Sequence, residues 1–223
     1  MKELIKKEND IFEILQEFIN LSLDFIVVGG YAVSAFKHRF SVDADIVVKS
    51  EDLPEFENVL KEQGFRKTNA RDLGGVYSSK FIRYEKEQVS IDILIDALTS
   101  RTTNASFSYV LLLNNSIRKK IIGIEREVLA RIPIKELLIV MKIHSGRLTD
   151  FRDIAALAKD ADLKLIRKFL FIGNLEHVNE NLSNFNNAVN DKNFIDSFKG
   201  VFIEKKFDVD LKLAKKISEL KQI

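Results

Sequence analysis

The sequence has no cysteine, only two prolines and only three histidines among its 223 residues. Without cysteine the chain forms neither a disulfide nor a thiolate metal site, and this composition fits a cytoplasmic location. The histidines are scattered without ligand spacing, which argues against a zinc site. No stretch approaches the roughly 18 consecutive apolar residues of a membrane span. The first residues mix charges with apolar side chains, so no signal-peptide core is expected there.

The charge and composition describe a globular chain. A formal net charge of +2 is too small to indicate a nucleic-acid partner by itself. Hydrophobic residues make up 46% of the sequence and charged residues 30%, and a chain of this length can bury a substantial core. No internal repeat and no low-complexity segment is evident.

The first half of the chain, 1–132, predicts mixed helix and strand. Apolar residues at helical spacing predict an opening amphipathic helix, and short apolar runs bounded by glycines or charges predict strands. Taken in order, we expect a helix over 3–22, a strand over 24–28, a helix over 31–40, a strand over 42–49, a helix over 50–64, a loop at 67–75, a strand hairpin over 76–85 and 88–96, and one or two strands within 119–133.

The second half, 133–223, predicts helices alone. Pro133 stands near the start of the first of them, where proline is tolerated, and no proline follows it. Helical patterns are expected over 132–146, 148–162 and 163–173, followed by three more helical stretches. The predicted fold class is therefore α+β, with a domain over 1–132 and a helical domain over 133–223.

Gly29 and Gly30 stand where the first strand turns into a helix. Glycine permits a tight turn and close approach of a ligand to the backbone, and the N–H groups of a helix start favour a phosphate. A plain tight turn is the alternative, because neither the dinucleotide-binding pattern nor the P-loop pattern is complete.

Three aspartates are the candidate metal ligands. Asp43 and Asp45 alternate with apolar residues on one strand, so both side chains face the same side. Asp92 lies inside a strand of isoleucines, a costly position unless the carboxylate is paired or bound to a metal. If the two strands are neighbours, the three acids converge on a site of hard oxygen ligands suited to Mg²⁺ or Mn²⁺. A solvent-facing strand end is the alternative for Asp43 and Asp45.

These motifs, taken in order, resemble the DNA polymerase β-like nucleotidyltransferases. The stretch from Gly29 through Arg39, Ser41, Asp43 and Asp45 is similar to the branch that contains the AbiEii-type toxins. That branch also carries a lysine on a later helix and an aspartate-rich motif after it, and Lys142, Asp150 and Asp153 follow in a similar order. The resemblance spans about residues 24–157. The chain departs from many relatives at Tyr31, where they place a serine near the second glycine.

The resemblance implies a minimal nucleotidyltransferase-type mixed sheet with flanking helices, followed by a helical domain. It implies that Asp43, Asp45 and Asp92 hold Mg²⁺ or Mn²⁺ and carry catalysis together with Lys142 and Asp150. The nucleotide, an NTP, would contact five residues: Gly29, Gly30, Arg39, Ser41 and Lys142. From the residues alone, Lys142 reads equally as a solvated surface lysine, and the two later aspartates as acids at a helix start.

The implied activity is metal-dependent transfer of NMP from an NTP to an acceptor hydroxyl. The acceptor would be the 3′ end of tRNA, a hydroxyl of a partner antitoxin protein or a small molecule such as an aminoglycoside. Either of the first two acceptors is compatible with a role as a toxin–antitoxin component. The alternative is a non-catalytic protein that keeps the fold and binds a nucleotide or a partner.

Overall fold

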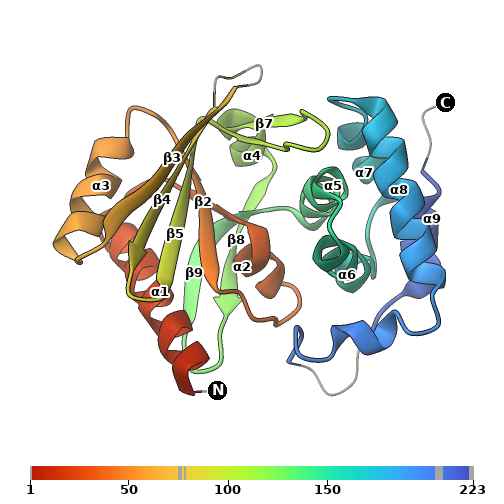
Figure 1. The fold of residues 1–223 in the computed structure, drawn as a ribbon, viewed down its shortest axis with the longest axis horizontal. Helices are drawn as coiled ribbons and strands as arrows, with labels where there is room; N and C mark the ends of the chain where they lie inside the picture. The colour runs from red at the N-terminus through yellow and green to blue at the C-terminus, as the bar shows by residue number, and fades with distance from the viewer. Residues whose placement is uncertain (1, 75–76, 78, 204–207, 221–223) are drawn as a thin grey trace. The chain divides into compact units, whose positions relative to one another are not determined.

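The structure is a computed structural model, and it describes residues 2–74, 77, 79–203 and 208–220 (Figure 1). The described chain divides into two compact units. The first consists of the residues up to Thr99 together with Phe107–Pro133, and the second of Ser100–Ser106 together with the chain from Ile134 onward. In the described residues, no helix combines the length and the apolar character that crossing a membrane requires.

A five-stranded mixed sheet forms the centre of the first unit, in the order β1-β2-β5-β4-β3 (Figure 1). β2 runs parallel to β5, and the other neighbouring pairs are antiparallel. The central strands are rich in valine and isoleucine, residues that favour extended backbone and pack well against a helix layer. The strands are β1 (Ile26–Val28), β2 (Asp43–Val48), β3 (Arg66–Gly74), β4 (Ser79–Lys86) and β5 (Val89–Ile95).

One face of this sheet is packed against helices α1 (Lys2–Asn20) and α3 (Leu53–Glu62). Phe18 of α1 meets Phe56 of α3 edge to face, with ring centroids 4.9 Å apart. The Tyr84 hydroxyl donates to the Glu57 carboxylate of α3. The Tyr84 side chain of β4 therefore points to the face that α3 covers. Because side chains alternate along a strand, the aspartates of β2 and β5 point to the other face.

Shorter elements complete the first unit. α2 (Gly29–Ser34) follows β1 directly, and its Ser34 hydroxyl donates to the Ile122 carbonyl of β8 at 2.7 Å. β8 pairs with β9 as an antiparallel hairpin, whose turn is bound to α1 through Glu8: the Ile124 N–H donates to this buried carboxylate at 2.6 Å. The bounds are β6 (Ala97–Thr99), β7 (Ser106–Ser108), α4 (Tyr109–Asn114), β8 (Ser116–Ile122) and β9 (Glu127–Pro133).

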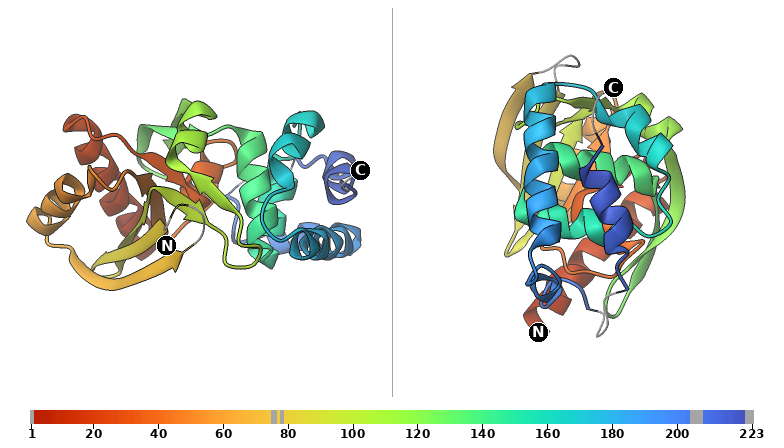
Figure 2. Two further views of the ribbon diagram at one scale, coloured as in Figure 1. Left: turned by 90° about the horizontal axis from the view of Figure 1, so that it is seen from above. Right: turned by 90° about the vertical axis from the view of Figure 1, so that its right-hand side faces the viewer.

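The second unit is helical, as predicted. α5 packs against α6, α7 and α8, and α9 packs against α8; the two views of Figure 2 show α8 and α9 side by side. Apolar side chains such as Phe151 and Phe185 meet in its core, with ring centroids 5.6 Å apart. The elements are α5 (Lys135–Ser145), α6 (Leu148–Leu157), α7 (Leu163–Leu170), α8 (Leu175–Asn190), the short 3₁₀ helix η1 (Ile195–Phe198) and α9 (Leu211–Ser218).

Two predicted elements are wrong. The expected loop at 67–75 is largely the edge strand β3, which is polar and exposed on both faces and therefore lacks the alternation that marks a strand. The helix expected over 31–40 starts earlier, at Gly29, and ends at Ser34, so Arg39 lies in an irregular segment. β6, β7 and α4 were not predicted. Positions 75, 76 and 78 of the predicted loop and hairpin, and 221–222 of the predicted last helix, lie outside the described residues.

Candidate active site

The three predicted metal-binding aspartates come together on one face of the sheet. β2 and β5 are neighbours, and their register sets Asp45 beside Asp92 and Asp43 beside Ser90. Paired residues on adjacent strands point to the same side, so the three carboxylates share the face opposite α1 and α3. Their chain neighbours Ala44 and Ile46 are fully buried on the other side. The apolar half of each strand therefore fixes the direction of its acids.

The glycine pair lies directly against this cluster. Gly29 has a positive φ of 64°, and a Cβ at this position would lie 2.0 Å from Oδ2 of Asp45. A Cβ at Gly30 would lie 2.4 Å from the Ser41 hydroxyl oxygen and 3.5 Å from the guanidinium carbon of Arg39. Both positions therefore need glycine, because polar side chains occupy the space where a methyl group would stand.

The irregular segment before β2 is held in place by Tyr31. Its side chain is fully buried in the first unit, and its hydroxyl donates to the Ser41 carbonyl at 3.0 Å. The Ser41 hydroxyl in turn donates to the Asp43 carbonyl at 3.2 Å. Tyr31, at the position where the chain differs from many relatives, thus positions the segment that leads into Asp43. Burial raises the pKa of its phenol.

Arg83 is a member of the cluster that the sequence did not reveal. It lies on β4 opposite Asp92 of β5, and its Nε and Nη2 donate to the two oxygens of Asp92, each at 2.7 Å. Nη2 also lies 3.5 Å from Oδ2 of Asp43. The hydrogen bonds with Asp92 raise the pKa of the Arg83 guanidinium. An arginine on the less buried face of an alternating strand carries no local signal of this kind, because only strand register selects its partner.

The donor set fits one divalent ion better than it fits two. Asp43 and Asp45 offer hard carboxylate oxygens on one side of one strand, and the missing side chain at Gly29 accommodates the carboxylate of Asp45. However, no group of three or more His, Cys, Asp or Glu side chains suited to a metal ion is present among the described residues. Both oxygens of Asp92 accept hydrogen bonds from the Arg83 guanidinium, which stands in place of a shared ion.

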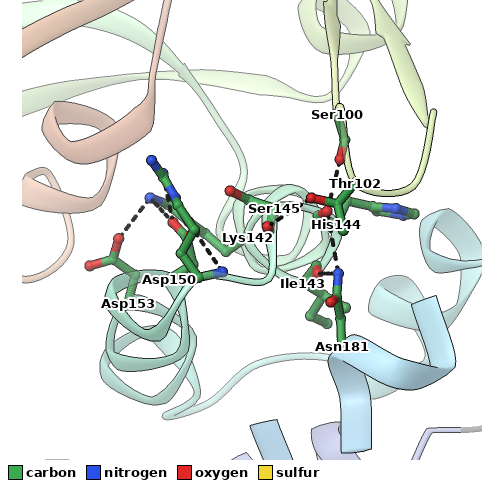
Figure 3. Close-up of polar contacts among 10 residues, drawn as sticks. Ser100, Thr102, Lys142, Ile143, His144, Ser145, Asp150, Asp153 and Asn181 are labelled. Carbon is green, nitrogen blue, oxygen red and sulfur yellow. Dashed lines mark hydrogen bonds and ion pairs between the residues drawn. The ribbon is translucent and has the colours of Figure 1, made fainter. Parts of the chain in front are cut away.

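Lys142, Asp150 and Asp153 form a separate cluster within the second unit (Figure 3). The Lys142 ammonium of α5 lies 2.9 Å from Asp150 and 2.7 Å from Asp153, both on α6. The Arg147 guanidinium, which precedes α6, donates to both oxygens of Asp150 at 2.7 and 3.2 Å. Two cations thus balance two carboxylates. Lys142 is buried rather than solvated at a helix edge, which corrects the surface reading of this residue.

Electrostatics keep Lys142 and Asp150 ionised although both are buried. Burial opposes a charged Lys142, yet Asp153 and Asp150 outweigh that effect and raise the pKa of Lys142. Burial likewise works against an ionised Asp150, but Lys142 and Arg147 lower the pKa of Asp150 to about 2. Arg147 is the exposed member, with 70% of its side chain accessible to solvent.

A network of polar contacts on His144 ties the segment 100–106 to α5 within the same unit (Figure 3). The Thr103 hydroxyl and Nδ1 of His144 are 2.7 Å apart, and Nε2 lies 3.0 Å from the Leu170 carbonyl. The Ser100 hydroxyl donates to the His144 carbonyl at 2.8 Å, and the Asn181 amide donates to that of Ile143 at 2.9 Å. Burial lowers the pKa of His144 to about 4, so the ring is neutral near pH 7.

The predicted site residues therefore fall into two groups. The first unit brings together Gly29, Gly30, Arg39, Ser41, Asp43, Asp45 and Asp92; the second unit brings together Lys142, Asp150 and Asp153. A pocket of about 620 Å³ elsewhere in the first unit is lined by α1 and by residues such as Phe65 and Val89, and contains none of them.

Comparison with known proteins supports the fold. No family model matches the sequence, and no curated protein matches it. The chain is similar to the solution structure of the antibiotic-resistance factor ANT(2'')-Ia, with a TM-score of 0.52 and 15% identity over 73% of this chain and 88% of that one.

Two crystal structures are also similar. ANT(2'')-Ia in complex with adenylyl-2''-tobramycin has a TM-score of 0.47 and 15% identity, covering 79% of this chain and 95% of that one. The lincomycin-bound lincosamide antibiotic adenylyltransferase LnuA has a TM-score of 0.47 and 17% identity, covering 69% and 98%. The likeness to the solution structure confirms the predicted α+β class, a mixed sheet flanked by helices with a helical C-terminal part. The AbiEii branch stays a prediction.

Proposed function

We propose that the protein is a metal-dependent nucleotidyltransferase that moves NMP from an NTP to an acceptor hydroxyl. The observation that supports this most is the register that sets Asp45 beside Asp92, with Asp43 on the same face. Three carboxylates from two strands converge beside a glycine turn that leaves no room for side chains. The fold shared with ANT(2'')-Ia adds to this support.

Each residue has a role in the proposed reaction. The acceptor oxygen attacks the α-phosphorus, the bond from that phosphorus to the bridging oxygen breaks, and pyrophosphate leaves. Gly29, Gly30, Arg39 and Ser41 would bind the triphosphate, because backbone N–H groups, a hydroxyl and a guanidinium suit phosphate oxygens. Asp43 and Asp45 would hold Mg²⁺ or Mn²⁺, which, when bound, neutralises phosphate charge. Asp92 would take the proton of the acceptor hydroxyl, since a carboxylate keeps acceptor sites beyond those used by Arg83.

The remaining assignments concern the second unit and the acceptor. We assign residues 1–132 to the catalytic domain and 133–223 to a helical domain that selects the acceptor, with Lys142 and Asp150 assisting through their charges. The proposed acceptor is the 3′ end of tRNA or a hydroxyl of a partner antitoxin in the cytoplasm, where NTPs are made. An antibiotic hydroxyl is the third candidate, because ANT(2'')-Ia is an antibiotic-resistance factor.

A non-catalytic nucleotide-binding or partner-binding protein is the competing function. Its support is the engagement of both Asp92 oxygens by Arg83, which leaves the acid cluster partly neutralised without any ligand. A protein of this kind would bind NTP at the glycine turn and transfer nothing.

Transfer of radiolabel from α-labelled NTPs separates these functions. Purified protein is incubated with Mg²⁺ and each NTP in the presence of total tRNA, cell protein or aminoglycosides, and the products are resolved by size. We expect label in one acceptor class. In Asp43→Asn the rate of labelling should fall on the order of 10³-fold, because a carboxylate proposed to hold the metal ion is removed.

Asp72→Asn is the matched control. Asp72 lies on the edge strand β3, and its oxygen accepts the Gly74 N–H at 2.8 Å, a bond that asparagine retains. This variant should label the acceptor like the wild type. Labelling that survives Asp43→Asn would reject the proposed mechanism. NTP binding without labelling of any acceptor would favour the non-catalytic protein.

A further inference from the structure

Arg83 stands where a second divalent ion of the acid cluster would be expected. Its guanidinium contacts Asp92 through two hydrogen bonds of 2.7 Å and reaches to 3.5 Å from Asp43. It therefore bridges one acid from each of the two strands, which is the position of a shared cation. Paired hydrogen bonds between a guanidinium and a carboxylate are among the strongest and most directional in proteins.

Neighbouring strands hold this arginine in place. Arg83 and Asp92 are directly opposite in the antiparallel β4–β5 pair, so their side chains meet on the same face. The guanidinium also lies 4.0 Å from Glu85 and 6.0 Å from the centre of the Phe81 ring, both on that face of β4. The Asp92 side chain is 5% exposed, whereas those of Arg83 and Asp43 are 33% and 35% exposed. The pair is anchored at its buried end and open toward Asp43.

We infer that Arg83 takes the place of the second divalent ion, so that the protein uses a single Mg²⁺ or Mn²⁺ held by Asp43 and Asp45. This inference rests on the proposed nucleotidyl transfer and specifies its metal requirement. A second ion bound between Asp92 and Asp43 would meet the guanidinium, which repels it and already occupies both oxygens of Asp92.

The inference also gives Arg83 a defined role. As a positioning residue, it holds the Asp92 carboxylate oriented toward the shared face in the absence of nucleotide. Lysine cannot reproduce this contact, because an ammonium is a point charge without the planar fork. Arg83→Lys should therefore keep the charge and lose part of the orientation, whereas Arg83→Gln loses the charge.

Counting bound Mn²⁺ tests the inference without an activity assay. Wild type is titrated with Mn²⁺ in the presence of a saturating α,β-methylene NTP analogue that cannot be cleaved between its α- and β-phosphates, and free Mn²⁺ is measured by electron paramagnetic resonance. We expect one Mn²⁺ bound per protein chain beyond the amount that the same concentration of analogue binds without protein. In Arg83→Gln, a second Mn²⁺ should bind at least tenfold more tightly than in the wild type, because the competing cation is gone. Arg83→Lys should still bind one.

The matched control is Arg71→Gln. Arg71 of β3 is paired with Phe81, and it lies on the same sheet face as Arg83. Its loss removes the same charge from the same face, so it should leave the Mn²⁺ count at one. A second Mn²⁺ that appears equally in Arg71→Gln would overturn the inference, because net charge rather than the position of Arg83 would explain the result.

The wild-type count decides the matter even if a variant fails to fold. Two Mn²⁺ bound with comparable affinity to wild type would overturn the inference and leave the proposed transfer intact. A single ion in a folded Arg83→Gln would overturn it as well. If neither the wild type nor any variant binds Mn²⁺ beyond the amount bound by the analogue alone, the metal-dependent transfer itself is rejected, and the single-ion inference with it.

Discussion

Each unit contains a cluster of aspartates and basic side chains, and the two clusters differ in their exposure to solvent. In the first, three aspartates on strands lie near Arg83. The side chains of Asp43 and Arg83, 3.5 Å apart, are each about one third exposed. In the second, Asp150 and Asp153 on a helix meet Lys142 and Arg147, and both acids are almost fully buried. The first cluster is therefore open to solvent at Asp43, whereas the acids of the second are enclosed.

This difference agrees with the ligand site proposed for the first cluster and with a contribution of the second cluster to stability. A buried ion pair is stabilising only when each charge is matched, so removal of one partner from such a pair is costly. An open cluster of like charges instead gains from a cation that arrives with a ligand. The residue types alone do not distinguish these cases, because aspartates two or three positions apart occur in both.

The largest effect is expected from Lys142→Met. The substitution keeps the volume of the side chain but leaves Asp150 and Asp153 buried without their shared ammonium. We expect the free energy of unfolding to fall by about 3–5 kcal/mol. Urea denaturation measures it, with Lys164→Met as the control, since Lys164 is an exposed lysine of α7. A loss below about 1 kcal/mol would contradict the structural role of Lys142.

A pH titration should sharpen the contrast through His144 of the second unit. The pKa of this buried ring falls from an ordinary value of 6.5 to about 4. Between these two values the unfolded chain binds a proton that the folded chain does not. The free energy of unfolding should therefore decrease as the pH falls from 6.5 to about 4, by roughly 3 kcal/mol.

The test compares wild type with His144→Gln by denaturation at several pH values. The variant should lose the part of the pH dependence that lies in this window, even if it is less stable throughout. An unchanged slope would show that His144 is not the titrating group.

Gly29→Ala should break the first cluster by steric contact. The new Cβ would lie 2.0 Å from Asp45, and the backbone there has a φ of 64°. Gly74→Ala is a close control, because Gly74 has a φ of 61° and nothing within 4 Å of its would-be Cβ. Both should lose about 1–2 kcal/mol of unfolding free energy from the left-handed backbone.

Only Gly29→Ala should also weaken NTP binding, by about tenfold or more, which isothermal titration calorimetry measures. This corresponds to about 1.4 kcal/mol of binding free energy. Equal affinities in the two variants would mean that Asp45 and the turn do not form one nucleotide site.

The smallest effect on stability is expected from Asp43→Asn. Asp43 is about one third exposed and its contact with Arg83 is a long one of 3.5 Å, so solvent screening leaves little stability to lose, and the free energy of unfolding should change by about 0.5 kcal/mol or less. Thermal unfolding of this variant beside Lys142→Met gives the comparison directly. A loss of several kcal/mol in Asp43→Asn would show that both clusters are structural.

Much of the fold was predictable because its signals are local. The alternation around Asp43 and Asp45 and the isoleucines around Asp92 predicted two strands and the direction of their acids, and the structure places these strands side by side. The change to helices after Pro133 was equally clear. The catalytic and binding roles of these residues stay predictions.

What was missed depends on contacts between separate helices and strands. β3 has no apolar face of its own, and its pairing with β4 makes it a strand. Arg83 joins the acids only through its register with Asp92, and Lys142 is buried only because α6 brings two aspartates to it. These partners lie only 8 to 11 residues away, but on a neighbouring strand or helix, so the sequence pattern alone does not show the contact.

The order of amino acids by itself determined the periodicity of the backbone, and with it the side of each strand on which a carboxylate stands and the turn that only glycine permits. The tertiary structure alone decided which cation neutralises which acid. Periodicity is a property of neighbouring residues, whereas charge compensation is set by the surroundings of a side chain, which form only when separate helices and strands pack together.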